Sequence, residues 1–254
     1  MRIGILAAVA ALSACAEPPD YTLGERGRAQ LALETGPERY PGDECFLSCA
    51  IDRPLLLGTR ETIEIENPKG MPWLHAASSD PSVLTVEDHL ETCCDHGCTV
   101  GDSYDACLAA GAADVHYQFA FEVRAVGEGS ALLVLASKDD PVFDRVRLDV
   151  RAAASLQVEA HLQDDTGWWY RPVGELDLAG EHQRLRVTAR DRDGGALFAS
   201  EGITMSLRGD VAEFYGTEAT LGSAYGEVWP MARGTDALTA QSGTAVVAVP
   251  VVSK

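Results

Sequence analysis

The sequence predicts an all-β protein made of two tandem antiparallel β-sandwiches. Short segments in which apolar and polar residues alternate recur along the chain, and Gly, Pro and Asp residues separate them. The alternation runs to about residue 150, stops over residues 151–155, and then starts again. A period of two at regular spacing is typical of strands in a sandwich, and no convincing helix longer than two turns follows residue 55.

The first 14 residues have the features of a secretory signal peptide. One positive charge, at Arg2, precedes the apolar run "IGILAAVAALSA", which ends in small residues. The run is too short for a transmembrane helix, which needs about 20 apolar residues. The small residues on both sides of Cys15 would also permit a cut after Ala16, which would release a soluble protein.

The residues "LSAC" at positions 12–15 closely resemble the lipobox of bacterial lipoproteins. The resemblance implies that the chain is cut before Cys15 and that the Cys15 thiol carries acyl chains of the palmitate type. Two or three such chains give nearly permanent anchoring. Because residue 16 is not Asp, the resemblance also implies the outer membrane. We therefore expect a signal peptide over residues 1–14 and a lipid-anchored location in the cell envelope, on the periplasmic or the surface face.

The charge of the chain narrows the choice of partners. Asp and Glu number 39 against 20 Lys and Arg, which gives a formal net charge of −19 at pH 7. Such a chain repels nucleic acid and anionic lipid, so no nucleic-acid partner is expected.

Residues 15–44 are rich in Pro, Gly and charge, and we interpret them as a flexible tether. One piece of it, "RAQLALE", is compatible with a short helix. The first sandwich is expected over residues 45–152. Its strand signals are the segments "TIEIE", "VHYQFAFEVRA", "ALLVLAS" and "VRLDVR".

The second sandwich is expected over residues 153–254. The segments "SLQVEAHL", "RLRVTAR", "GITMSL" and "GTAVVAVPVV" alternate in the same way. Pro250 lacks an N–H group, so it must lie at an edge or near the end of the last strand.

Two segments of the first half carry a family resemblance. "SSDPSVLTV" at 78–86 and "VRAVGEGSALLVLAS" at 123–137 resemble the bacterial Ig-like domain, group 2. The second half is similar more faintly, with "LRGD" in place of "SSDP". The resemblance implies two immunoglobulin-like sandwiches that act as binding modules, spacers or stalks without catalytic machinery. The first departs from the family pattern by a cysteine-rich insert at about 88–114.

The cysteines have two interpretations. In a reducing compartment, the cluster within residues 93–98, which includes His96, would suggest a site for a soft metal ion. In an exported chain, six cysteines suggest three disulfides, each worth roughly 2–4 kcal/mol. We expect disulfides and no metal, with the two upstream cysteines tied to the insert; such staples could also hold the insert rigid as a recognition loop. The candidates are Cys45, Cys49, Cys93, Cys94, Cys98 and Cys107.

Two further motifs bear on ligand binding. Trp168, Trp169 and Tyr170 stand in a row, so strand alternation buries one or two of them and exposes the other, which could stack on a sugar or anchor a protein. The segment "DRDG" at 191–194 echoes the start of a calcium loop, but it lacks the later carboxylates, and a hairpin turn explains it better.

Catalytic motifs are not found in the sequence. It has no G-x-S-x-G elbow, H-E-x-x-H, Walker A loop or dinucleotide fingerprint, and no cofactor is implied. We therefore expect a non-enzymatic envelope lipoprotein that serves binding, adhesion or scaffolding through a protein or glycan partner. The alternatives are a secreted or periplasmic carbohydrate-binding module centred on residues 168–170, and an enzyme accessory domain.

Overall fold

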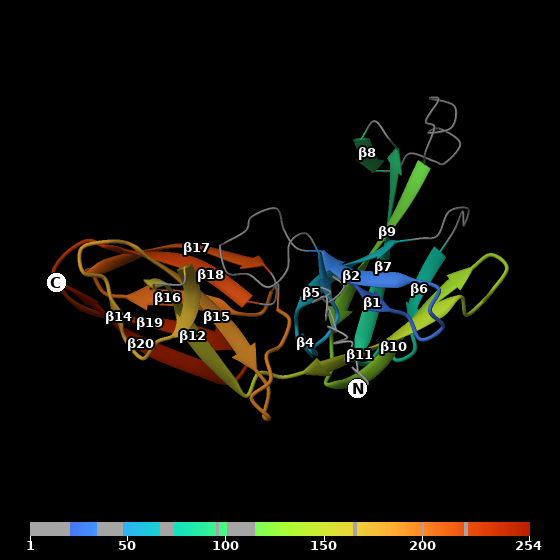
Figure 1. The fold of residues 1–254 in the computed structure, drawn as a ribbon. Helices are drawn as coiled ribbons and strands as arrows, with labels where there is room; N and C mark the ends of the chain where they lie inside the picture. The colour runs from blue at the N-terminus through green and yellow to red at the C-terminus, as the bar shows by residue number, and fades with distance from the viewer. Residues whose placement is uncertain are drawn as a thin grey trace, which may run out of the picture.

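A computed structural model describes residues 21–34, 48–66, 74–94, 97–100, 115–164, 167–199, 201–220 and 223–254. These residues form strands, turns and loops and no helix, and they build two β-sandwiches that follow one another along the chain (Figure 1). The all-β prediction is confirmed.

The first sandwich pairs a seven-stranded sheet with a four-stranded one. The larger sheet has the order β1 (Thr22–Leu23), β2 (Gln30–Glu34), β5 (Arg60–Glu66), β9 (Val115–Ala125), β7 (Leu84–Cys94) and β8 (Gly97–Val100), and β3 (Ser48–Ala50) also pairs with β2. The smaller sheet has the order β4 (Leu55–Leu56), β11 (Asp144–Arg151), β10 (Gly129–Ser137) and β6 (Leu74–Ser78).

The second sandwich pairs a five-stranded sheet with a four-stranded one. The larger has the order β13 (Gly167–Pro172), β12 (Ser155–Asp164), β15 (Gln183–Arg190), β18 (Ser223–Pro230) and β17 (Ala212–Thr220). The smaller has the order β14 (Leu176–Asp177), β20 (Ala245–Ser253), β19 (Gly234–Ser242) and β16 (Thr204–Arg208).

Both halves have the strand order of an immunoglobulin-like fold. Naming strands A to G along each half, one sheet reads A-B-E-D, as β2-β5-β9-β7 and again as β12-β15-β18-β17. The facing sheet reads A′-G-F-C, and its A′ strand runs parallel to G in both halves, as β4 with β11 and β14 with β20. This order confirms the prediction of two immunoglobulin-like sandwiches.

The two halves also share one tight packing contact. A Cβ atom on Gly129 would lie 3.1 Å from Val83 Cγ2, and one on Gly234 would lie 2.8 Å from Val211 Cγ2. Both glycines have φ near 148°, a region that side chains rarely adopt. Each valine carbonyl accepts two backbone N–H bonds from the chain just before its glycine. A glycine is therefore required at the start of strand F in each half.

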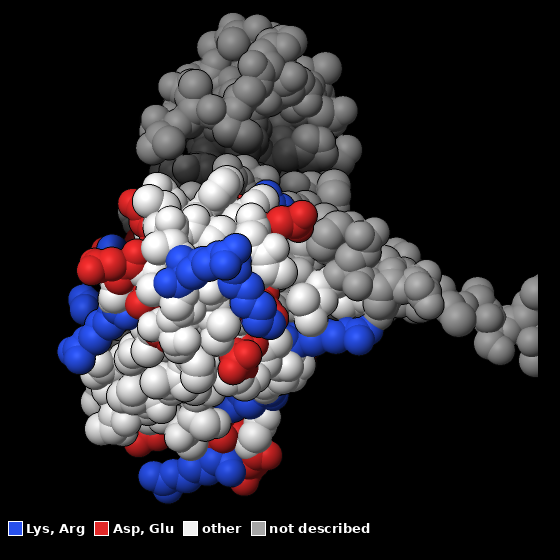
Figure 2. All heavy atoms as spheres, turned by 90° about the vertical axis from the view of Figure 1, so that its left-hand side faces the viewer, with Lys and Arg blue, Asp and Glu red and all other residues white. Residues whose placement is uncertain are grey.

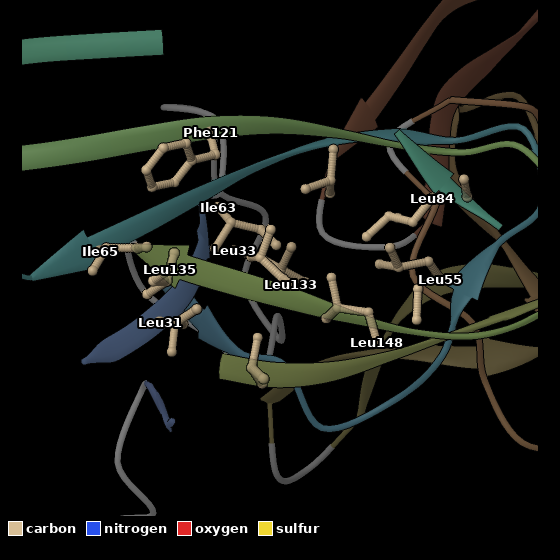
Figure 3. Packing of buried hydrophobic residues seen from close by; sticks show 14 of the residues in the cluster. Leu31, Leu33, Leu55, Ile63, Ile65, Leu84, Phe121, Leu133, Leu135 and Leu148 are labelled. Atoms are coloured by element: carbon tan, nitrogen blue, oxygen red, sulfur yellow. The ribbon is translucent and has the colours of Figure 1, made fainter. Parts of the chain in front are cut away.

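The first core is filled from both sheets (Figure 3). Leu31, Ile63 and Phe121 come from the larger sheet and meet Leu133 and Leu148 from the smaller one, and all of these are fully buried. Alternate residues of β11 are buried, as the period of two predicts.

The first sandwich begins earlier in the chain than expected. Residues 22–34, assigned from sequence to the tether over 15–44, form β1 and β2, and Leu31 and Leu33 are part of the core. The segment "RAQLALE" is thus a strand instead of a helix, because it pairs with β5 and buries Leu31 and Leu33 in the core. Asp144 fixes the turn before β2 by accepting backbone N–H bonds from Arg26, Arg28 and Ala29 at 2.7–2.8 Å.

The segment expected as an insert in the first sandwich starts as a β-arm. β7 and β9 stay paired from Leu84 opposite Ala125 to Cys94 opposite Val115, and β8 pairs back on β7. This D–E hairpin projects away from the sandwich, with β8 near its tip (Figure 1). The segment expected as a loop at about 88–114 therefore continues β7 to Cys94 and contributes β8.

The register places cysteine backbones at two separate parts of this sheet. Cys93 lies opposite Cys98 on the arm, whereas Cys49 of β3 lies opposite Leu33. β2, β5 and β9 stand between β3 and β7, which corresponds to about 19 Å at roughly 4.8 Å per strand. Since disulfides join Cα atoms about 4.4–6.8 Å apart, this register does not favour the expected link from Cys49 to the arm.

The two sandwiches exchange one core residue each. Leu56, from the first half, is buried in the second core, and Phe198, from the second half, is buried in the first core. Backbone bonds hold this junction: Leu56 N–H donates to the Phe198 carbonyl at 2.7 Å, and Phe198 N–H donates to the Pro54 carbonyl at 2.9 Å. Arg151 and Asp191 add an ion pair of 2.5 Å across the same junction. The two halves are therefore packed into one body.

Candidate functional site

The outer face of the five-stranded sheet in the second sandwich carries an arrangement of aromatic and acidic side chains. On β17 and β18, Glu213 lies opposite Trp229, and Tyr215 lies opposite Glu227. The two aromatic residues thus occupy one diagonal of a square and the two carboxylates the other. We call these four residues the checkerboard. Their strand neighbours Ala212 and Val228 point into the core, which fixes the outward direction of all four.

The aromatic rings of the checkerboard are exposed and held in place. Trp229 is 41% exposed and Tyr215 is 52% exposed. His182 stacks on the indole of Trp229, with ring centroids 4.4 Å apart and an interplanar angle of 11°. The ring of Tyr215 meets the same indole edge-on, at 6.2 Å and 79°. The exposed aromatic surface is therefore preorganised by its neighbours.

The carboxylates orient the polar atoms of these rings. The Tyr215 hydroxyl donates to Glu213 Oε2 at 2.6 Å, and Trp229 Nε1 donates to Glu227 Oε2 at 3.2 Å. Arg184 Nε donates to the other oxygen of Glu227 at 2.8 Å. The hydrogen bond to Glu213 raises the pKa of the Tyr215 phenol. The arrangement presents ring faces and carboxylate oxygens to solvent.

A second cluster on the same sheet face is packed, not open. Tyr170 lies between the guanidinium of Arg186, 4.5 Å from its ring centroid, and the imidazole of His161, at 4.9 Å. Arg186 donates to buried Glu159 at 2.6 Å. Burial alone would lower the pKa of Arg186, but the charges and hydrogen bonds of Glu159 and Tyr225 together outweigh burial and raise that pKa. These packed side chains join neighbouring strands of the sheet and stabilise it.

The aromatic row predicted from sequence is divided between two faces of the edge strand β13. Tyr170 belongs to the packed cluster, while Trp169 is 45% exposed and lies opposite Leu162, which is 39% exposed. Trp169 is thus an exposed member of the row. The side chain of Trp168 lies outside the described residues.

The other predicted sites are only partly covered. Cys15, Cys45 and Cys107 lie outside the described residues; for Cys49, Cys93, Cys94 and Cys98 only the backbone is described, in β3, β7 and β8.

Asp191, the first residue of the calcium-like segment, is a turn residue. It accepts the N–H groups of Asp193 and Gly195 at 2.9 and 2.8 Å and pairs with Arg151. The interpretation of a turn is confirmed. Within the described ranges, His, Cys, Asp and Glu side chains form no group suited to a metal ion. Those ranges also hold no helix with the length and apolar character to cross a bilayer.

The checkerboard was not predicted from sequence. The signal lies in "AEFY" and "GEVWP", where Glu and an aromatic residue recur two positions apart on the face opposite the apolar residues. The register that brings the two strands together was needed to reveal the square.

Comparisons with known proteins give distant structural likenesses. No protein-family model and no curated protein matches the chain. Domains 5–6 of the S-layer protein SbsC are similar at 18% identity and a TM-score of 0.30, covering 88% of this chain and 99% of that one. The Escherichia coli adhesin FdeC is similar at 13% and 0.30, covering 80% and 61%. Invasin, a bacterial integrin-binding protein, is similar at 10% and 0.33, covering 92% and 55%. At these scores the fold assignment rests on the strand order above.

Proposed function

We propose that this chain is a non-enzymatic binding module of the bacterial cell envelope, anchored through lipid on Cys15. The observation that carries the binding role is the checkerboard: two exposed, braced aromatic rings on a stiff sheet. Large, rigid aromatic side chains are the residues most enriched in binding hot spots. The anchoring part of the proposal is supported by the lipobox-like residues at 12–15.

The position of the checkerboard suits a module anchored at its N-terminus. β15 ends at Arg190, whose carbonyl binds Ala154 N–H at the junction with the first sandwich. Gln183, at the other end of β15, pairs with Val228, next to Trp229. The checkerboard therefore lies at the far end of the second sandwich (Figure 1). A ligand there would meet the protein at the end remote from β1.

The anchor is tested by metabolic labelling with a palmitate analogue. We expect label on the wild-type protein and none on Cys15→Ala. A mature N-terminus at Glu17, measured by mass spectrometry of the intact protein, would show that the chain is released instead of anchored.

The six remaining cysteines are proposed to form disulfides after export. The register makes Cys93 and Cys98 the cysteine pair with directly opposed backbones. Mass mapping under non-reducing conditions tests the proposal: six free thiols, or bound zinc, would overturn it.

One observation favours a second candidate function, a carbohydrate-binding module. Trp169 and Leu162 form an exposed apolar pair on the edge strand β13, apart from the checkerboard. A glycan array with wild-type protein and Trp169→Ala tests it. A blank array, or binding unchanged by the substitution, would exclude this site as a sugar platform.

A further inference from the structure

We propose that the checkerboard binds a basic peptide segment, with a lysine or arginine head group against its aromatic rings. The inference rests on the proposed binding function and adds to it the surface and the class of ligand.

The aromatic rings provide the first half of the recognition. The face of an indole or phenol ring carries a partial negative charge that attracts cations. The planes of Trp229 and Tyr215 lie 79° apart, so a group near both meets two walls instead of one flat plate. His182 covers one face of the indole and Tyr215 meets the indole edge-on, and Trp229 is still 41% exposed.

The carboxylates provide the second half. Glu213 and Glu227 contribute two negative charges and Arg184 neutralises one of them, so these three side chains carry a net charge of −1. The hydroxyl of Tyr215 and the Nε1 of Trp229 are both directed to these carboxylates. Beside the guanidinium of Arg184, the checkerboard offers a ligand ring faces and carboxylate oxygens, which accept hydrogen bonds and do not donate them. A cationic donor satisfies both, whereas an anionic ligand would be repelled.

Local groups decide the specificity at this end of the molecule. Figure 2 looks toward the end of the second sandwich that carries the C-terminus, and it shows uncharged side chains over most of that end with charges of both signs interspersed. On this face, the acidic side chains therefore do not gather into one patch, although the chain carries a net charge of −19. Binding at the checkerboard must come from its own rings and carboxylates.

A lysine or arginine side chain fits better than a small cation. Its long apolar stem covers apolar surface while its head remains polar. Met231, two residues beyond Trp229, is 65% exposed, and methionine adapts its shape to varied partners.

The test is a calorimetric titration of the full mature chain with a lysine-rich peptide and with the same peptide in which Gln replaces Lys. We expect the lysine peptide to bind and the glutamine peptide not to bind. Trp229→Ala is expected to weaken binding about fivefold, and Trp229→Phe less, since indole is the stronger cation partner. Trp169→Ala is the matched control, because Trp169 is 45% exposed on another face of the same sandwich, and it should bind as the wild type does.

A second pair of variants separates local recognition from general attraction. Glu213→Gln should weaken binding, while Glu175→Gln removes the same charge from an exposed position elsewhere in the sandwich and should not. Thermal unfolding confirms that each variant is folded. The proposal would be overturned if Trp229→Ala and Trp169→Ala, or Glu213→Gln and Glu175→Gln, weakened peptide binding equally. It would also be overturned if a neutral oligosaccharide bound the wild type and Trp229→Ala abolished that binding. Palmitate labelling of Cys15 is independent of all these results, so failure here is distinguishable from failure of the anchoring proposal.

Discussion

Replacing Phe198 by Ala is expected to destabilise the first sandwich, although Phe198 lies in the part of the sequence that forms the second sandwich. Its ring is 2% exposed and packs with Leu55 and other residues of the first core. Removing a buried phenyl ring typically costs 3–5 kcal/mol. The ring also lies 4.7 Å from the Arg53 guanidinium, a contact worth about 0.5–1 kcal/mol.

The backbone of the junction limits the damage. The hydrogen bonds of Phe198 to Leu56 and Pro54 involve main-chain atoms only, so Phe198→Ala keeps them. We therefore expect a loss near the lower end of the range, about 3–4 kcal/mol in total.

The assay is hydrogen exchange followed residue by residue, with Leu197→Ala as the matched control. Leu197 is the preceding residue and is fully buried, but in the second core. Phe198→Ala should lower protection in β10 and β11, and Leu197→Ala in β19 and β20. If Phe198→Ala lowered protection in β19 and β20 alone, the exchange of core residues would be refuted.

Two further predictions concern a turn carboxylate in the first sandwich and a strand-F glycine in the second. Burial alone would raise the pKa of Asp144, but backbone N–H donors, among them those of Arg26 and Arg145, outweigh burial and lower it. Its contribution to stability is therefore full above the unfolded pKa of about 3.9 and is lost as pH falls through the lower folded pKa. Asp144→Asn should remove this part of the acid dependence of Tm and cost about 1–3 kcal/mol; a Tm profile parallel to wild type between pH 5 and 2 would contradict it. Gly234→Ala should lower the free energy of unfolding by about 1–3 kcal/mol, because the new Cβ would lie 2.8 Å from Val211 Cγ2 at a φ of 148°. Gly174→Ala has open space and an ordinary φ, so urea denaturation should show a change within about 0.5 kcal/mol.

The fold was predictable because burial repeats with the same period as the side chains of a strand. In β11, Val146, Leu148 and Val150 are buried and the residues between them are not, as the alternating sequence pattern predicts. The start of the first sandwich was harder to predict. "RAQLALE" favours a helix by local propensity, and only its pairing with β5, residues 60–66, makes it a strand.

The candidate site was less predictable, for a different reason. The sequence draws attention to three adjacent aromatic residues, but alternation sends Tyr170 into a packed cluster and leaves Trp169 on the other face. Tyr215 and Trp229 are 14 positions apart and come together only through the pairing of β17 with β18. That pairing includes a β-bulge between Tyr215 and Glu218, which shifts the register by an amount that the sequence does not specify.

The exchange of Leu56 and Phe198 means that the two sandwiches depend on each other for a complete core, so they should evolve as one unit. Many tandem modules recombine freely, because each keeps its own core when it acquires a new neighbour. Here, cutting the chain between Arg151 and Ser155 would strip the ring of Phe198 from one core and the side chain of Leu56 from the other. A shuffled copy of either half would carry a void and an uncovered apolar residue into its new setting, so evolution can duplicate or transplant this protein far more readily as a doublet than as separate cassettes.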